Sequence, residues 1–197
     1  MRMVLAAAAA LSIWAASAAA APWTSPDSKI SFDLPAGWLV APQDADDMTY
    51  IVAGSGDKEC DFMARPRAQT AAIPPDVIRE SGKLAVAPAD WARLIPLAPD
   101  VFGGQASFVS SEVSTDAFWP VQLADFRVQG RIVHAAIQFR PGVDLWAFCQ
   151  SRSGADDVAT YRAVLRSVGA PNDAALQADA ERLAAQRQSV AQNQNAP

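Results

Sequence analysis

The stretch VQLADFRVQGRIVHAAIQFRPGVDLWAFCQ, residues 121–150, decides the fold class of this chain. Apolar and polar residues alternate through most of it with a period of two, as they do in β-strands. The pairs Gln129-Gly130 and Pro141-Gly142 interrupt the alternation with residues typical of tight turns. Together with the preceding QASFVSSEV, residues 105–113, the stretch predicts four consecutive antiparallel strands. A change of phase near Ala124-Asp125 predicts a bulge.

The upstream part of the chain shows the same alternation. ISFDLPAGWLV, residues 30–40, reads as a strand that ends at a Pro-Ala-Gly-Trp turn, and we expect an edge hairpin there whose Trp38 covers the end of the sheet. DMTYIVAG and ECDFMARP, residues 47–54 and 59–66, are separated by a short polar turn and predict a second hairpin.

Three other segments have helical periodicity. Residues 74–85 and 88–97 predict two short helices, each with an aspartate near its start. Residues 154–171 predict the clearest helix in the chain, with one apolar stripe and with Arg162 and Arg166 facing away from it. The stripe consists of Val158, Tyr161, Val164, Leu165 and Val168.

The sequence therefore predicts one domain of the α+β class over residues 21–170, with an antiparallel sheet between helices in an α/β/α sandwich. Residues 171–197 follow as a weakly helical or disordered tail, because its apolar seam is thin. We expect that tail to be dispensable for folding and available to a partner.

The first twenty residues have the layout of a secretory signal peptide: Arg2, an alanine-rich apolar run, and small residues before Pro22. We expect cleavage after Ala20, because cleavage one residue later would leave proline first. The alternative, an uncleaved membrane anchor, is disfavoured because alanine drives insertion weakly. The mature protein is expected to be periplasmic or secreted, with no membrane span after the leader.

Charge excludes some classes of partner. The chain has a net charge of −5, which becomes −6 when the leader with Arg2 is removed. The sequence contains no basic patch, so nucleic acid and anionic lipid surfaces are not expected partners.

Cys60 and Cys149 are the two cysteines of the chain. An even count in an exported protein predicts a disulfide, which here closes a long loop and stabilises the fold by about 4 to 5 kcal/mol in the chain-entropy model. The alternative is two buried thiols packed as small hydrophobic groups.

Candidate chemistry is sparse. His134 is the one histidine, and it lies on the strand face opposite Val133, Ala135 and Ile137. A general base needs a positioned nucleophile, and the sequence offers no such motif, so we interpret His134 as a structural or surface residue. With one histidine, a zinc site is not expected. No cofactor is predicted.

Two further features were considered as sites. The acidic loop of Asp44, Asp46 and Asp47 lacks the remaining ligands of a calcium loop, so a solvated loop is favoured and cation binding is left open. Exposed aromatic and tail residues could contact a partner, although a core position is favoured for the tryptophans. These candidate contacts are Trp91, Trp119, Leu176, Leu183 and Val190.

The two ends of the domain carry a resemblance. ISFDLPAGWLV near the start and DDVATYRAVLRSV at the end, which closes on Ser167-Val168, resemble the PsbP-like/DcrB-like family, whose fold is shared with the Ran-binding Mog proteins. The resemblance implies an antiparallel sheet between helices and a non-catalytic accessory or binding role. This chain departs from many members of the family by lacking a lipoprotein cysteine and by having two internal cysteines.

These observations predict an exported, non-catalytic accessory or binding protein, whose ligand or envelope partner the sequence does not identify. One alternative is a small envelope hydrolase that uses His134 with an unrecognised nucleophile. The other is a structural subunit of an envelope complex.

Overall fold

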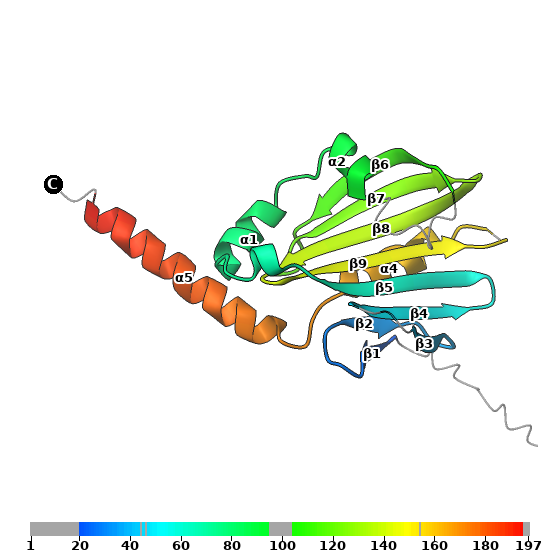
Figure 1. The fold of residues 1–197 in the computed structure, drawn as a ribbon, viewed down its shortest axis with the longest axis horizontal. Helices are drawn as coiled ribbons and strands as arrows, with labels where there is room; N and C mark the ends of the chain where they lie inside the picture. Colours follow the sequence, from blue (N-terminus) through cyan, green and yellow to red (C-terminus); the bar gives the residue numbers. More distant parts are fainter. Residues whose placement is uncertain (1–19, 44, 46, 95–103, 154, 195–197) are drawn as a thin grey trace, which may run out of the picture.

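A computed structural model describes residues 20–43, 45, 47–94, 104–153 and 155–194 (Figure 1). The strands in this part of the chain are β1 (Ala21–Thr24), β2 (Ser31–Leu34), β3 (Leu39–Gln43), β4 (Thr49–Ser55), β5 (Lys58–Pro66), β6 (Ala106–Ser114), β7 (Val121–Val128), β8 (Arg131–Arg140) and β9 (Val143–Ser151). The helices are a 3-10 turn η1 (Ala68–Thr70), α1 (Pro75–Gly82), α2 (Pro88–Leu94), α4 (Val158–Ser167) and α5 (Asp173–Gln194).

Seven of these strands form one antiparallel sheet in the order β3-β4-β5-β9-β8-β7-β6. The four consecutive strands predicted from residues 105–150 are confirmed as β6, β7, β8 and β9. The two groups of strands read from the sequence are parts of the same sheet, because β5 pairs with β9 along nine residue pairs. The fold is α+β, as predicted.

Two irregularities follow the sequence signals. Gln129 and Gly130 join β7 to β8 with φ values of 49° and 84°, a left-handed pair that suits a two-residue hairpin turn. The register of β6 against β7 shifts between Phe108 and Ser110, opposite Phe126 and Asp125. The predicted bulge therefore exists, but the extra residue belongs to β6.

The predicted edge hairpin at the start of the domain is wrong. β2 pairs with β1 in a separate two-stranded sheet, whereas β3 pairs with β4 at the edge of the large sheet. The Pro-Ala-Gly-Trp turn thus carries the chain from one sheet to the other. Trp38 is buried in the core between them.

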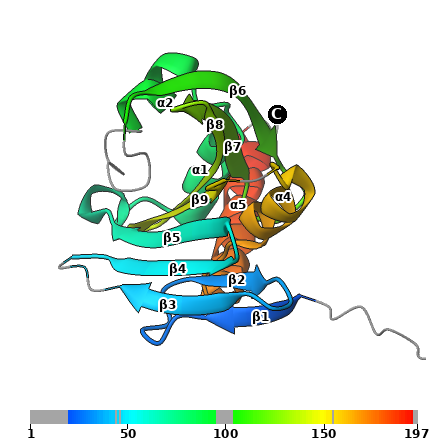
Figure 2. The same ribbon diagram turned by 90° about the vertical axis from the view of Figure 1, so that its right-hand side faces the viewer.

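Both faces of the large sheet are covered (Figure 2). On one face α4 and β2 enclose a core that contains Phe32, Phe62 and Leu165. On the other face α2 contributes Trp91 to a second core that contains Phe126 and Phe148. This double coverage explains why most residues of β7, β8 and β9 are buried whichever way they point.

α4 is the helix predicted from residues 154–171. Asp157 caps its N-terminus by accepting a hydrogen bond from the Thr160 backbone amide at 3.3 Å. Tyr161, Val164, Leu165 and Val168 of the predicted stripe are buried, but Val158 is 46% exposed because it begins the helix at its outer end. The expectation that Arg162 faces away is also wrong, as the site shows below.

The structure has a continuous 22-residue helix, α5, where the sequence predicted a weakly helical or disordered tail. Its first residue, Asp173, binds Arg140 of β8, and its Arg187 binds Asp76 of α1 at 2.6 Å. Between these two ion pairs Ala180 is fully buried. How strongly the helix is held in solution stays a prediction.

Candidate functional site

The two cysteines form the predicted disulfide. Cys60 of β5 and Cys149 of β9 are directly opposite in the register of the two strands, with Cα atoms 4.1 Å apart, and both are fully buried. They lie on the face that α4 covers. The bond therefore links two central strands of the sheet.

His134 occupies the same face and is the centre of a polar cluster. It lies opposite Cys149 in the register of β8 and β9 and is 2% exposed. Its Nδ1 lies 2.7 Å from Oδ1 of Asp125, and its Nε2 lies 2.9 Å from Oδ1 of Asp156. Because each ring nitrogen faces a carboxylate, the arrangement suits an imidazolium that donates both of its N–H groups.

Arg162 completes this cluster from α4. Its Nη2 donates to both oxygens of Asp125, at 2.8 and 2.9 Å. We call Asp125, His134, Asp156 and Arg162 the His134 cluster. It joins β7, β8, the segment before α4, and α4 itself.

The charges of this cluster support one another. Burial alone lowers the pKa of His134, but the hydrogen bonds and charges of Asp125 and Asp156 outweigh burial and raise that pKa. Burial alone raises the pKa of Asp125, but the hydrogen bond from His134 and the charge of Arg162 outweigh it and lower that pKa. The cluster is thus a stabilised set of ion pairs.

The sequence placed His134 on the correct strand face, and α4 makes that face a buried one. Ser110 Oγ donates a hydrogen bond to Asp125 at 3.1 Å, and the hydroxyl groups of Tyr161 and Ser151 are hydrogen-bonded to each other at 2.7 Å. Neither hydroxyl reaches an imidazole nitrogen, since the carboxylates occupy both. In the part of the chain that the structure describes, no hydroxyl is hydrogen-bonded to His134, although the Tyr161 ring lies beside it with the two ring centroids 5.6 Å apart.

The candidate partner contacts fall in different places. Trp91 and Trp119 are both buried, and Trp119 lies beneath Arg140, whose guanidinium carbon is 4.4 Å from the ring centroid. Leu176 and Leu183 on α5 are half-buried, and Val190 is 54% exposed. The structure does not bring these five residues together at one surface, because the tryptophans point into the domain.

Asp47 is the residue of the predicted acidic loop that lies within the described ranges. Asp47 is exposed. Asp44 and Asp46 lie outside the described residues, so their cation binding stays untested. Among the residues that the structure does describe, no group of three or more histidines, cysteines or acids could hold a metal ion.

One of the buried aspartates lacks the ion pair that the others have, and it indicates a site that the sequence did not reveal. Asp61, Asp76 and Asp144 are each less than a tenth exposed. Asp76 is paired with Arg187 at 2.6 Å, and Asp144 with Arg67 at 3.4 Å. Asp61 forms no ion pair with any residue in the described ranges. Buried carboxylates are ordinarily paired, so Asp61 is the exception that needs a reason.

Asp61 lies on β5 and faces away from α4. It is 4% exposed, and its Oδ1 accepts a hydrogen bond of 2.6 Å from the hydroxyl of Tyr50 on β4. Burial raises the pKa of Asp61 to about 6, with a smaller contribution from Glu59 and opposing ones from Tyr50 and Arg152. A strongly shifted acid beside a surface hollow is a candidate functional group.

A groove of about 330 Å³ lies at the β3 edge of the sheet, and Asp61 is a neighbour of residues that line it. Val52, which lines it, is directly opposite Asp61 in the register of β4 and β5. Glu59, which also lines it, precedes Asp61 by two residues on the same strand face. We call this hollow the β3–β5 groove; its lining is Gly37, Leu39, Ala41, Val52, Gly54, Ser55, Gly56, Lys58 and Glu59.

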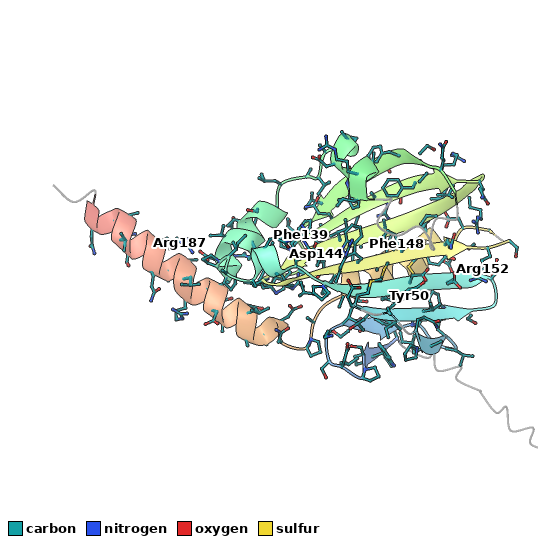
Figure 3. All side chains as sticks on the ribbon, viewed as in Figure 1. Tyr50, Phe139, Asp144, Phe148, Arg152 and Arg187 are labelled. Atoms are coloured by element: carbon teal, nitrogen blue, oxygen red, sulfur yellow. A yellow bond between two sulfur atoms is a disulfide. The ribbon has the colours of Figure 1, made fainter. Side chains whose placement is uncertain are left out.

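Two residues of β9 and its end complete the surroundings. Gln150 lies opposite Glu59, and its Oε1 is buried without a hydrogen-bond partner. Arg152, just beyond β9, donates to both oxygens of Glu59. Figure 3 shows Asp144 and Arg152 at opposite ends of β9, with Phe148 and Tyr50 between them. The arrangement offers oxygen acceptors beside an apolar hollow.

The sequence carried only one signal for this site. In ECDFMARP the apolar residues Cys60, Phe62 and Ala64 predict a core face, which assigns Asp61 to the opposite face. That assignment is correct, but alternation does not show that the second face is also covered. The partners of Asp61 depend on the register of β4, β5 and β9, which no local pattern specifies.

The comparisons with known proteins bear on the fold. No family model matches the chain, and a search of curated proteins found no match. Among solved structures, the chain is similar to cyanobacterial PsbP (CyanoP) from Synechocystis sp. PCC 6803, with a TM-score of 0.54 and 15% identity over 83% of this chain and 98% of that one. This similarity confirms the PsbP-like fold that the two end motifs predicted.

Two weaker similarities are also found. A crystal structure from Bacteroides thetaiotaomicron VPI-5482 has a TM-score of 0.41 at 12% identity, over 76% of this chain and 47% of that one. A protein of unknown function from Pseudomonas aeruginosa has a TM-score of 0.33 at 12% identity, over 73% of this chain and 89% of that one.

A helix that crosses a membrane must be long and apolar, and the described helices differ from that pattern. None of them, α5 included, is both long and apolar enough to span a bilayer.

Proposed function

We propose that this protein is an exported, non-catalytic binding protein that takes up its ligand in the β3–β5 groove. The observation that carries the proposal is Asp61, a buried carboxylate beside the groove without a cationic partner among the described residues. Burial of an unpaired charge costs stability, and carboxyl groups with strongly raised pKa values are concentrated at binding and catalytic sites.

Export is supported by the leader and by the disulfide. Residues 1–20 have the charge, apolar run and small residues of a signal peptide. A disulfide between Cys60 and Cys149 is typical of proteins that fold in an oxidising compartment. The periplasm or the extracellular medium is therefore the proposed location.

The hydrolase alternative has less support. A histidine base must accept a proton from a nucleophile through a free ring nitrogen. Both nitrogens of His134 face carboxylates, at 2.7 and 2.9 Å, and both cysteine sulfurs are held in the disulfide. We therefore assign His134 a structural role in the proposed protein.

A second candidate function, a structural subunit of an envelope complex, draws on one feature of α5. The outer half of this helix lines a hollow of about 370 Å³ with Leu183, Arg187 and Val190. Capture of an envelope protein that depends on Val190 and not on Asp61 would favour this second function over the first.

Two measurements test the proposed function. N-terminal sequencing of protein from the cell envelope or medium should return Ala21 as the first residue; full-length chain retained in the membrane fraction would contradict export. Panels of ester, peptide and glycoside substrates should show no turnover. Turnover that disappears in His134→Ala, with the variant still folded, would contradict the non-catalytic role.

A further inference from the structure

The charge balance around Asp61 leaves one negative charge without a partner. The guanidinium of Arg152 is engaged by Glu59, and the ammonium of Lys58 pairs with Asp157, beside α4 on the opposite face of the sheet. Tyr50 supplies a hydrogen bond but no charge. The charge of Arg152 lowers the pKa of Asp61 but the two form no ion pair, so ionised Asp61 attracts a further cation.

Three oxygen-bearing side chains are arranged around this position. Asp61 and Glu59 lie two residues apart on one face of β5, about 7 Å along the strand. Gln150 is the cross-strand neighbour of Glu59, at roughly 5 Å between Cβ atoms, and its Oε1 has no hydrogen-bond partner. A primary ammonium has three N–H donors and no acceptor, which suits these three oxygen-bearing side chains, with the Glu59 carboxylate shared between the ammonium and Arg152.

The rest of the groove is apolar. Leu39 is 81% exposed, and with Ala41 and Val52 it gives the groove a hydrocarbon floor next to the acceptors. Gly54 cannot be replaced without changing this floor, because a Cβ there would meet the Lys58 carbonyl oxygen of the adjacent strand. The groove thus combines an apolar surface with an acidic end.

From these observations we propose that the β3–β5 groove binds a small organic amine, with its protonated amino group at Asp61, Glu59 and Gln150 and its hydrocarbon part over Leu39, Ala41 and Val52. This inference rests on the proposed binding function and names the class of ligand. The molecule that carries the amino group is a free small molecule and not a segment of protein. β3 is a five-residue edge strand that contains Pro42, so its outer edge is poorly suited to pairing with an added peptide strand.

The test is a calorimetric or NMR titration of the protein with 4-phenylbutylammonium at pH 8, beside the neutral analogue 4-phenylbutan-1-ol. We expect the ammonium to bind at least tenfold more tightly than the alcohol and to shift the amide signals of Val52, Glu59 and Asp61. Asp61→Asn should reduce ammonium affinity at least tenfold and leave alcohol affinity unchanged. Asp47→Asn, which removes the same charge from an exposed residue, is the matched control and should bind as the wild type does.

A second arm uses pH. At pH 5 most of Asp61 is protonated, since its pKa is about 6, so ammonium affinity should fall about tenfold relative to pH 8. Glu59, Tyr50 and Arg152 are the other groups acting on this carboxyl. Asp61→Asn should remove the pH dependence.

Each other outcome is decisive. Equal binding of the alcohol and the ammonium, unaffected by Asp61→Asn, would overturn the amine assignment while leaving a binding groove. No binding of either probe would overturn the assignment, and the proposed non-catalytic role would then still be judged by the His134→Ala turnover test. Tighter binding of the peptide acetyl-Leu-Lys-Val-amide, lost in Asp61→Asn, would overturn the small-molecule source.

Discussion

Arg140 and Asp173 form a two-point ion pair at the junction of the sheet and the last helix. Nε of Arg140 donates to one oxygen of Asp173 at 2.6 Å, and Nη2 donates to the other at 3.0 Å. Arg140 is 1% exposed, so its charge is neutralised inside the protein. Asp173 also accepts a hydrogen bond from the Ala170 backbone amide, which fixes the start of α5.

This pair changes the expectation for the tail. Truncation after Ala170 would remove Asp173 and leave Arg140 buried without its carboxylate, at a cost of about 3 to 5 kcal/mol. Asp173→Ala should reproduce most of that loss in urea unfolding. Asp179→Ala, at an exposed position of the same helix, should change stability by less than about 0.5 kcal/mol. Equal stability of the protein truncated after Ala170 and the wild type would show that the tail is dispensable, as the sequence alone suggested.

The His134 cluster predicts a pH window of stability. The pKa of His134 is raised, so its contribution is complete below the ordinary histidine pKa of about 6.5 and is lost as pH rises through the folded-state pKa. The pKa of Asp125 is lowered, so its contribution is present above the ordinary aspartate pKa and is lost as pH falls through the folded-state value. Each unit by which a pKa is displaced corresponds to about 1.4 kcal/mol.

Urea unfolding of wild type and His134→Gln across pH 4 to 10 measures this directly. The difference between the two proteins should be largest between about pH 4 and about pH 6.5 and should shrink as the pH rises above that window. In an Asp156→Asn background, which lacks one of the two carboxylates facing His134, the stability difference caused by His134→Gln should be smaller. A difference that grows with alkaline pH would mean that His134 is neutral in the folded protein.

Asp61→Asn should stabilise the protein at pH 8. The asparagine carbonyl can still accept the Tyr50 hydrogen bond, while the buried unpaired charge is removed. Because the pKa of Asp61 is raised to about 6, the wild type loses stability as pH rises from about 4 to about 6, and the variant escapes that loss. Melting temperatures at pH 4.5 and pH 8 provide the comparison, and a variant less stable than wild type at pH 8 would mean that Asp61 has a stabilising partner.

The disulfide should be complete in protein taken from an oxidising compartment. Alkylation without reduction, followed by mass spectrometry, should label neither Cys60 nor Cys149. Replacing both cysteines with alanine should lower stability by about 2 to 5 kcal/mol. Two labelled residues would contradict the bridge, and an unchanged melting temperature of the double variant would show that the bond adds little to a sheet already paired at this point.

The sequence predicted the elements far better than the contacts between them. Alternation and turn residues located β4 to β9, and the stripe around Leu165 located α4. Local patterns could not show that β2 pairs with β1 and not with β3, because either pairing buries Phe32. They also could not show that α4 covers His134.

The candidate site could not be predicted from the sequence for a similar reason. Asp61 reads as an outward-facing acid in a strand, and its isolation becomes visible only when the partners of Asp76 and Asp144 are known. Those partners, Arg187 and Arg67, come from distant segments of the chain. Buried ion pairs depend on tertiary contacts, whereas period-two alternation is a local pattern in the sequence.

The central claim, that Asp61 is a buried carboxylate held for a cationic ligand, is tested most directly by its own titration. NMR of protein labelled with 13C at the aspartate side-chain carboxyl should give Asp61 a pKa of about 6 in the free protein. Saturation with 4-phenylbutylammonium should bring that pKa back toward the ordinary value of about 4, because the bound ammonium favours the ionised form. A pKa near 4 without ligand, or a raised pKa that the ammonium does not move, would contradict the account.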